Sequence, residues 1–104
     1  MDYTRYYLKW HRDSPSHRQA MCAYYHRLLQ DHLPKNKEAK ILDAGCGMGF
    51  AMSALQQLGY QKVEGFDTDK NQVALAQKAG LTVQWAENSL SFLQKQTNAM
   101  DLIL

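Results

Sequence analysis

The sequence lacks the features that mark membrane, secreted and disulfide-rich proteins. No run approaches the roughly 20 consecutive apolar residues that cross a bilayer, and the first residues do not contain the apolar core of a secretory signal. The two cysteines, Cys22 and Cys46, form neither a metal-ligand spacing nor a disulfide framework. We therefore expect a soluble, cytoplasmic protein whose two thiols are reduced.

The charge and the histidine content indicate no metal site and no particular partner. The formal net charge is +2, and the positive excess lies in the first 40 residues, where basic and aromatic side chains alternate. Such a segment is either a surface for an anionic partner or an ordinary solvated surface, and we favour the second. The four histidines are scattered at spacings that make no metal-binding set, so we assign no metal. Neither a membrane nor a nucleic acid is indicated as a partner.

Glycine is concentrated in one stretch, residues 40–50. There Gly45, Gly47 and Gly49 alternate after a short apolar run and before a helical pattern. This order predicts a strand, a tight turn and a helix. Because glycine permits a positive φ and a close approach of the backbone to a ligand, we expect the amides of the turn to face a pocket above the end of the strand.

An acidic residue, Asp43, ends the predicted strand just before the first glycine. A carboxylate at this place would repel a pyrophosphate and attract an ammonium group. The glycine spacing also differs from the dinucleotide fingerprint, which would place its last glycine where Phe50 stands. Both features disfavour NAD and favour a nucleoside that bears an amino acid.

The segment from Ile41 to Gly49, ILDAGCGMG, resembles motif I of the class I S-adenosylmethionine-dependent methyltransferases. The resemblance covers roughly Lys40 to Leu104. It implies an α/β fold, a truncated Rossmann-like parallel sheet with flanking helices that contains the first four strands of seven. It also implies S-adenosylmethionine as the cofactor. The residues of the motif that would bind it are Asp43, Ala44, Gly45, Cys46, Gly47 and Gly49.

Helical periodicity and stop signals predict the remaining helices. Ser14-Pro15 is typical of a helix start, and Leu33-Pro34 ends that first helix. Gly59 and Gly80 end two more helices, and a last one follows residue 88. The predicted apolar stripes are Met21, Tyr25, Leu28 and Leu29; Ala51, Ala54, Leu55 and Leu58; and Val73, Ala76 and Ala79. The last helix runs through Leu90, Phe92 and Leu93.

Strands are predicted at residues 63–66, 81–85 and 100–104, in addition to the one before the glycine turn. Because strand–helix–strand crossovers are right-handed, these strands form one parallel sheet with helices on its faces. We divide the chain into an N-terminal helical extension, residues 1–36, and an incomplete cofactor-binding Rossmann-like domain, residues 37–104.

Acidic side chains follow the second and third predicted strands. Asp67, with Thr68 beside it, follows the second strand, so it lies beside the pocket, where a carboxylate suits the two ribose hydroxyls. Glu87 and Asn88 follow the third strand, and the resemblance implies that they contact the adenine. Asn88 or Ser89 would also cap the next helix, as we expect of Asp69 with Gln72.

No catalytic residue is identified, because the family places many acceptor-orienting residues after the fourth strand, beyond Leu104. We expect a methyltransferase domain, an incomplete enzyme or a fragment of one, that transfers a methyl group to an unknown acceptor. One alternative is a binding or interaction module that retains the cofactor site without catalysis. The other, an NAD-type oxidoreductase, is disfavoured by Asp43 and by the glycine spacing.

Two further expectations concern the ends of the chain. In related enzymes an N-terminal segment closes over the cofactor. Accordingly, four residues either cover the methionine part or, as we favour for each, pack against the sheet: Arg5, Tyr6, Tyr7 and Trp10. At the other end, the fourth strand would be an apolar edge that invites pairing with a second chain. We expect a homo-oligomer through this strand unless the helix of residues 14–33 covers the gap.

Overall fold

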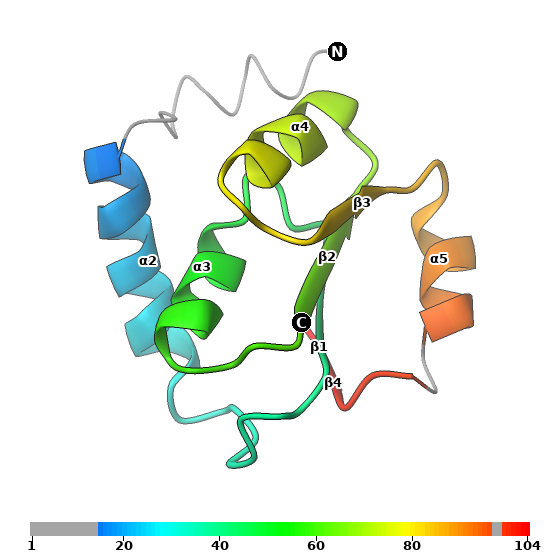
Figure 1. The fold of residues 1–104 in the computed structure, drawn as a ribbon. Helices are drawn as coiled ribbons and strands as arrows, with labels where there is room; N and C mark the ends of the chain where they lie inside the picture. Colours follow the sequence, from blue (N-terminus) through cyan, green and yellow to red (C-terminus); the bar gives the residue numbers. More distant parts are fainter. Residues whose placement is uncertain (1–14, 97–98) are drawn as a thin grey trace.

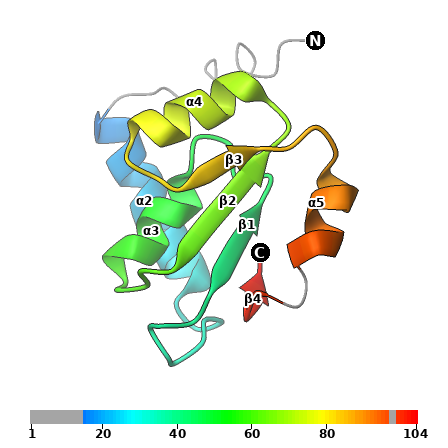
Figure 2. The same cartoon turned by 45° about the vertical axis from the view of Figure 1, so that its right-hand side comes forward.

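A computed structural model describes residues 15–96 and 99–104. Its elements are, in order, α2 (Pro15–Leu29), β1 (Ile41–Ala44), α3 (Phe50–Gln57), β2 (Val63–Asp67), α4 (Lys70–Lys78), β3 (Val83–Trp85), α5 (Ser89–Gln96) and β4 (Leu102–Ile103). The strands form one parallel sheet in the order β3-β2-β1-β4 (Figures 1 and 2). This confirms the predicted Rossmann-like α/β fold. No helix within the described residues is long and apolar enough to cross a membrane.

The register brings the carboxyl ends of β1, β2 and β3 to one edge of the sheet. Ala44 at the end of β1 pairs with Phe66 of β2, and Asp67 pairs with Trp85 at the end of β3. The loops that follow β1, β2 and β3 therefore leave the sheet side by side, which is the place where ligands bind in parallel α/β folds.

Helices cover both faces of the sheet. Helices α2, α3 and α4 lie on one face and α5 lies on the other (Figure 2). Successive strand residues point to opposite faces, so Ile41 joins the cluster under α3 and α4 whereas Leu42 joins the cluster under α5. In that second cluster the rings of Phe66 and Phe92 lie 4.4 Å apart. The hydrophobic core thus has two layers, one on each side of the sheet.

Helix α2 differs from its predicted extent and face. It ends at Leu29, not at Leu33, because the chain turns to place Leu33 against the core and the Pro34 carbonyl accepts a hydrogen bond from the Tyr60 hydroxyl. Cys22 is its buried residue, and Leu28, predicted to face inward, is 52% exposed. The predicted cap Ser14 and the four N-terminal residues expected near the cofactor, Arg5, Tyr6, Tyr7 and Trp10, lie outside the described residues.

Arg18 attaches α2 to the segment before and within α3. Its guanidinium donates to the Met48 carbonyl at 2.9 Å and to the Ser53 hydroxyl at 3.4 Å, and it lies 4.9 Å from the centre of the Phe50 ring. A planar guanidinium suits this combination of bidentate donation and stacking. The N-terminal helix is therefore bonded directly to the glycine turn.

Strand β3 begins at Val83 rather than at the predicted Leu81. The amide of Leu81 donates a hydrogen bond to the Ala76 carbonyl at 3.2 Å. Gly80 has a φ of +85°, so Gly80 and Leu81 form a C-terminal cap of α4 with the glycine in the left-handed conformation. An amide used in this way cannot join the sheet ladder. The end of α4 at Gly80 was predicted, but the part that Leu81 takes in this helix cap was not.

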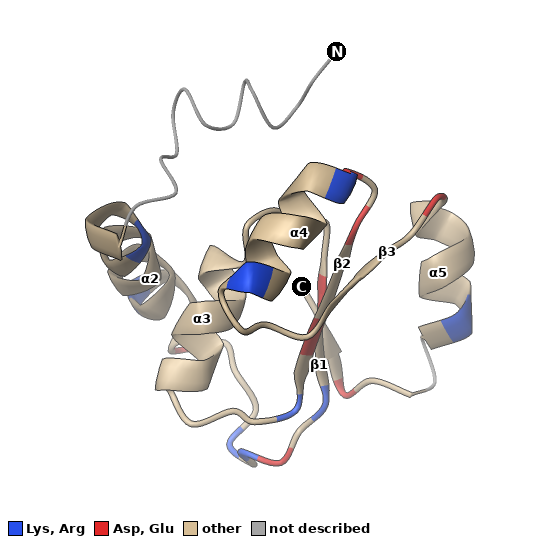
Figure 3. Cartoon of the chain, turned by 45° about the horizontal axis from the view of Figure 1, so that its top comes forward, with Lys and Arg blue, Asp and Glu red and all other residues tan. Residues whose placement is uncertain are grey.

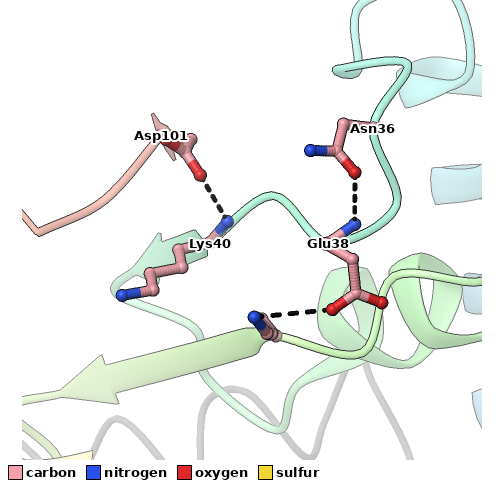
Figure 4. A network of polar contacts seen from close by, with 5 residues as sticks. Asn36, Glu38, Lys40 and Asp101 are labelled. Atoms are coloured by element: carbon pink, nitrogen blue, oxygen red, sulfur yellow. Dashed lines mark hydrogen bonds and ion pairs between the residues drawn. The ribbon is translucent and has the colours of Figure 1, made fainter.

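Strand β4 is assigned to Leu102–Ile103, shorter than the predicted 100–104. Figure 4 shows how its start is fixed: the Asp101 carboxylate accepts from the Lys40 amide at 2.8 Å. The amides of Asp101 and Leu102 in turn donate to the Lys40 carbonyl. At the other end Leu104 donates to Leu42 at 2.8 Å, so backbone pairing continues past the assigned strand.

The linker before β1 carries charged side chains and lies at the amino-terminal edge of the sheet, opposite the carboxyl ends of the strands. The Asn36 side chain accepts from the Glu38 amide, and the Glu38 carboxylate lies 3.4 Å from the Lys62 ammonium (Figure 4). In Figure 3, basic residues gather in this linker, whereas acidic residues occupy the segment between β2 and α4. The carboxyl edge of the sheet is therefore the more acidic of the two.

Candidate functional site

The turn after β1 has the conformation that its glycines predict. Gly45, Gly47 and Gly49 have φ angles of +67°, +56° and +83°, all in the left-handed region that other residues rarely adopt. Gly49 also caps α3, and a Cβ there would overlap the side chain of Leu81. The turn thus depends on glycine for its backbone and, at Gly49, for packing.

Three amides of the turn do not face the pocket as predicted. Cys46 donates to the Phe66 carbonyl at 2.9 Å, Gly47 donates to a carboxylate oxygen of Asp67 at 2.9 Å, and Gly49 donates to the Cys46 carbonyl at 2.9 Å. These three donors are satisfied within the protein. The expectation was wrong for them because the end of β2 lies close enough to take two of the bonds.

Asp67 is held in place through both of its oxygens. Oδ2 accepts from Gly47 and Oδ1 accepts from the Asp69 amide, both at 2.9 Å. Each carboxylate oxygen has two lone pairs, so each keeps one for a ligand. Asp67 is partly exposed. Its carboxylate is thus oriented by the protein and still able to accept two hydroxyl groups.

Asp43 is buried, with 8% of its surface exposed. Burial, and in second place the charge of Asp67, raise the pKa of its carboxyl to about 6. Both effects disfavour the charged form, and a cation bound nearby would reverse them. The paired carboxylates at this edge therefore favour a positively charged ligand.

A cavity of about 150 Å³ opens beside Asp43. Helix α2 contributes Tyr25 and Leu29 to its wall. The other lining residues are Gly45, Cys46, Phe50, Ala51 and Leu104. The sequence analysis placed Tyr25 only on an inward apolar stripe. Its phenol beside an acidic strand end is a feature that helical spacing alone does not reveal.

A larger cleft of about 450 Å³ lies at the opposite edge of the sheet, lined by Lys40, Lys62, Glu64, Thr82 and Met100 among others. It contains none of the predicted site residues. Ligands of parallel α/β sheets bind at the carboxyl ends of the strands. We therefore assign the functional site to the smaller cavity and the acidic edge beside it.

The residues predicted to reach the adenine lie on the same edge, one loop farther along. Thr68 accepts a hydrogen bond from the Trp85 indole at 2.9 Å, and Lys70 lies 4.5 Å from the centre of that ring. Glu87 is exposed. Asn88 caps α5 by accepting from the Ser91 amide at 3.0 Å, which confirms the capping alternative.

Asp69 is also a helix cap, as predicted. Its carboxylate accepts from the amides of Asn71 and Gln72 at 2.9 and 3.2 Å at the start of α4. The structure thus brings Asp43, the glycine turn and Asp67 together at one edge of the sheet, with Asp67 bonded to the turn. Glu87 and Asn88 do not line the cavity beside Asp43, and the side-chain oxygen of Asn88 already accepts a hydrogen bond.

Residues 41–104 match the sequence model of a methyltransferase domain family. The match covers more than half of the chain, so the chain belongs to this family, and the resemblance of its glycine turn to the class I enzymes is confirmed. No curated protein matches the sequence significantly.

Solved structures resemble this one over a part of their length. A protein of Thermoplasma acidophilum is 25% identical with a TM-score of 0.51, over 62% of this chain and 36% of that one. An S-adenosylmethionine-dependent methyltransferase from Mesorhizobium loti is 30% identical with a TM-score of 0.51, over 58% and 30%. A protein of Pyrococcus horikoshii, 18% identical with a TM-score of 0.64 over 83% and 42%, shows the fold alone. The chain spans less than half of each neighbour.

Proposed function

We propose that the chain binds S-adenosylmethionine at the acidic edge of its sheet and forms the cofactor-binding part of a methyltransferase with an unidentified acceptor. The observation that carries the proposal is the contact of Asp67 with Gly47, which joins Asp67 to the glycine turn, whose residues Gly45 and Cys46 line a cavity with Asp43. The Mesorhizobium loti neighbour, described as S-adenosylmethionine-dependent, supports the choice of cofactor.

The donor set suits this ligand group by group. Asp43 would hold the ammonium of its amino-acid part, and Asp67 would accept the two ribose hydroxyls with its remaining lone pairs. At Gly45 no atom of the described residues lies within 4 Å of the place where a Cβ would stand, so the backbone leaves room for the ligand. Ala44, Cys46 and Gly49 would complete the methionine side. Thr68, Glu87 and Asn88 would line the adenine side.

The bound cofactor supplies a methyl group on a positively charged sulfur, and the protein mainly binds and orients it. Cys46 contributes a thiol to the wall of the cavity beside Asp43. Burial, together with the charges of Asp43 and Asp67, raises the pKa of its thiol to about 12. The thiol also donates to the Gly47 carbonyl at 3.6 Å. Because only a thiolate attacks efficiently, the raised pKa disfavours attack by the Cys46 thiol.

The role of Asp67 is tested by Asp67→Ala with S-adenosylhomocysteine as the ligand in isothermal titration calorimetry. We expect the affinity to fall about tenfold or more, because hydrogen bonds to a charged group contribute roughly 1.5 to 3 kcal/mol each. Asp69→Ala is the matched control, since it removes a carboxylate two residues away that caps α4. It should lower stability by about 1 kcal/mol and keep the affinity. Equal affinity of Asp67→Ala and the parent would exclude Asp67 as the ribose ligand.

We also propose that the 104-residue chain associates through β4, whose residue Ile103 is 37% exposed. Leu29 and Leu33 pack against the same core cluster as Leu102, and β4 is the last strand on its side of the sheet. The amides of Leu102 and Leu104 donate to β1, so the Ile103 amide between them points away from it. That amide is available to a second chain.

Sedimentation velocity at micromolar concentration should show a dimer or larger species, and Ile103→Lys should give a monomer. Hydrogen exchange at the Ile103 amide should be slow in the parent and fast in the variant. A monomeric parent with a rapidly exchanging Ile103 amide would contradict this association.

The proposed location is the cytoplasm, where Cys22 and Cys46, both free in the structure, would stay reduced.

A further inference from the structure

We propose that the hydroxyl of Tyr25 on α2 holds the carboxylate of the cofactor's amino-acid part, while Asp43 holds its ammonium. This inference rests on the proposed S-adenosylmethionine site and adds a residue to it from outside the matched domain, which begins at residue 41. Tyr25 and Asp43 line the same cavity of about 150 Å³. The cavity thus lies between the N-terminal helix and the end of β1.

Helix α2 is fixed at this place by contacts with the turn region itself. Arg18 donates to the Met48 carbonyl, and one turn later the Cys22 thiol lies 3.6 Å from the Phe50 carbonyl. Tyr25 and Leu29 follow at the next two turns of the same helix face, and both line the cavity. The position of the Tyr25 ring is therefore set by a helix that is bonded to the cofactor-binding turn.

The cavity needs a second polar group because an amino-acid ligand carries two charges. Asp43 attracts the ammonium but repels the carboxylate. Among the described residues that line the cavity, the other polar side chains are Tyr25 and Cys46. A thiol is a weak donor, and that of Cys46 already points to the Gly47 carbonyl. The Tyr25 hydroxyl is thus the strong neutral donor available to the carboxylate.

The surroundings keep this hydroxyl protonated. Burial raises the pKa of Tyr25, and the charges of Asp43 and then Tyr24 raise it further. The effect of Asp43 also reflects the proximity of the phenol to the carboxylate. Leu29, Phe50 and Ala51 supply apolar wall for the methylene groups of the ligand. The cavity therefore combines one acid, one neutral donor and an apolar surface, as an amino-acid side arm requires.

Tyr25→Phe tests the inference, because it removes the hydroxyl and keeps the ring. Calorimetric titration should be done with S-adenosylhomocysteine and with its decarboxylated analogue, S-adenosyl-3-thiopropylamine, which keeps the nucleoside and the ammonium. We expect Tyr25→Phe to lower the affinity for S-adenosylhomocysteine about tenfold and the affinity for the decarboxylated analogue less than about twofold. Tyr24→Phe is the matched control, since Tyr24 is the neighbouring residue on α2 and is 49% exposed. It should change neither affinity.

Three results would overturn the inference. One is a parent-like affinity of Tyr25→Phe for S-adenosylhomocysteine. Another is an equal loss for both ligands, which would indicate a contact with the ammonium or a general change in the cavity. The third is a parent protein that binds neither ligand, and that result alone would also remove the proposed function. Thermal unfolding of each variant confirms that the compared proteins are folded.

Discussion

Asp43→Asn is expected to stabilise the ligand-free protein at pH 7 while it weakens the binding of S-adenosylhomocysteine about 10- to 100-fold. The loss follows from the missing carboxylate, because a hydrogen bond to a charged group contributes roughly 1.5 to 3 kcal/mol. The gain in stability follows from burial, since the pKa of Asp43 is raised from 3.8 to about 6. An ionised carboxylate at this place costs on the order of 3 kcal/mol. Calorimetry and thermal unfolding measure the two effects separately.

The pH dependence of the Asp43 effect has a definite sign. The folded protein binds the proton more tightly than the unfolded chain, so protonated Asp43 favours folding. Its contribution to stability falls as the pH rises from about 4 to about 6. The advantage of Asp43→Asn should therefore be small at pH 4 and reach its full size above pH 6.

Binding to the parent should change with pH in the opposite direction. A ligand ammonium favours the ionised carboxylate, so affinity should increase up to about pH 6 and fall about tenfold for each pH unit below it. The Asp43→Asn variant should show no such slope. Asp31→Asn, at an exposed acid after α2, is the control that should match the parent in both measurements. Parent-like binding by Asp43→Asn across this range would contradict the assignment of Asp43.

Gly49→Ala is expected to cause the largest loss of stability among the turn glycines. Its φ of +83° costs an alanine about 1 to 2 kcal/mol. The added Cβ would also overlap Leu81, which is 6% exposed and belongs to the core cluster. Overpacking of this kind costs a further 1 to 3 kcal/mol or so. In a chain of this size the melting temperature should fall by more than about 10 °C, as measured by thermal unfolding.

Gly80→Ala separates the two causes. Gly80 has a nearly equal φ of +85°, but no atom of the described residues lies within 4 Å of its added Cβ. It should lose only the conformational part, about 1 to 2 kcal/mol. An equal loss of stability in both variants would contradict the close packing of Gly49 against Leu81.

The sequence was most informative where one residue type permits one backbone conformation. Alternating glycines predicted the turn between β1 and α3, and the acidic residues at the ends of β1 and β2 predicted which side chains meet there. Parallel strands bring such ends to one edge. The position of Asp67 beside the glycine turn therefore followed from strand order and spacing, although its hydrogen bond with Gly47 did not.

Features that depend on tertiary distance were not predictable in the same way. The amides of Cys46 and Gly47 are satisfied by β2, which lies about 20 residues farther along the chain, and no local pattern signals this. Helical spacing placed Tyr25 on the inward face of α2 but did not show that Tyr25 would line the same cavity as Asp43. For the same reason Leu28 was wrongly assigned to the core, since the direction in which α2 packs on α3 decides it.

Isothermal titration calorimetry of the parent chain with S-adenosylmethionine and, separately, with NAD tests the cofactor assignment most directly. The arrangement of Asp43, the glycine turn and Asp67 predicts saturable one-to-one binding of S-adenosylmethionine and none of NAD. At 100 times its dissociation constant the ligand should add about 2.7 kcal/mol to the free energy of unfolding. A folded sample that binds NAD and leaves S-adenosylmethionine unbound would contradict the assignment.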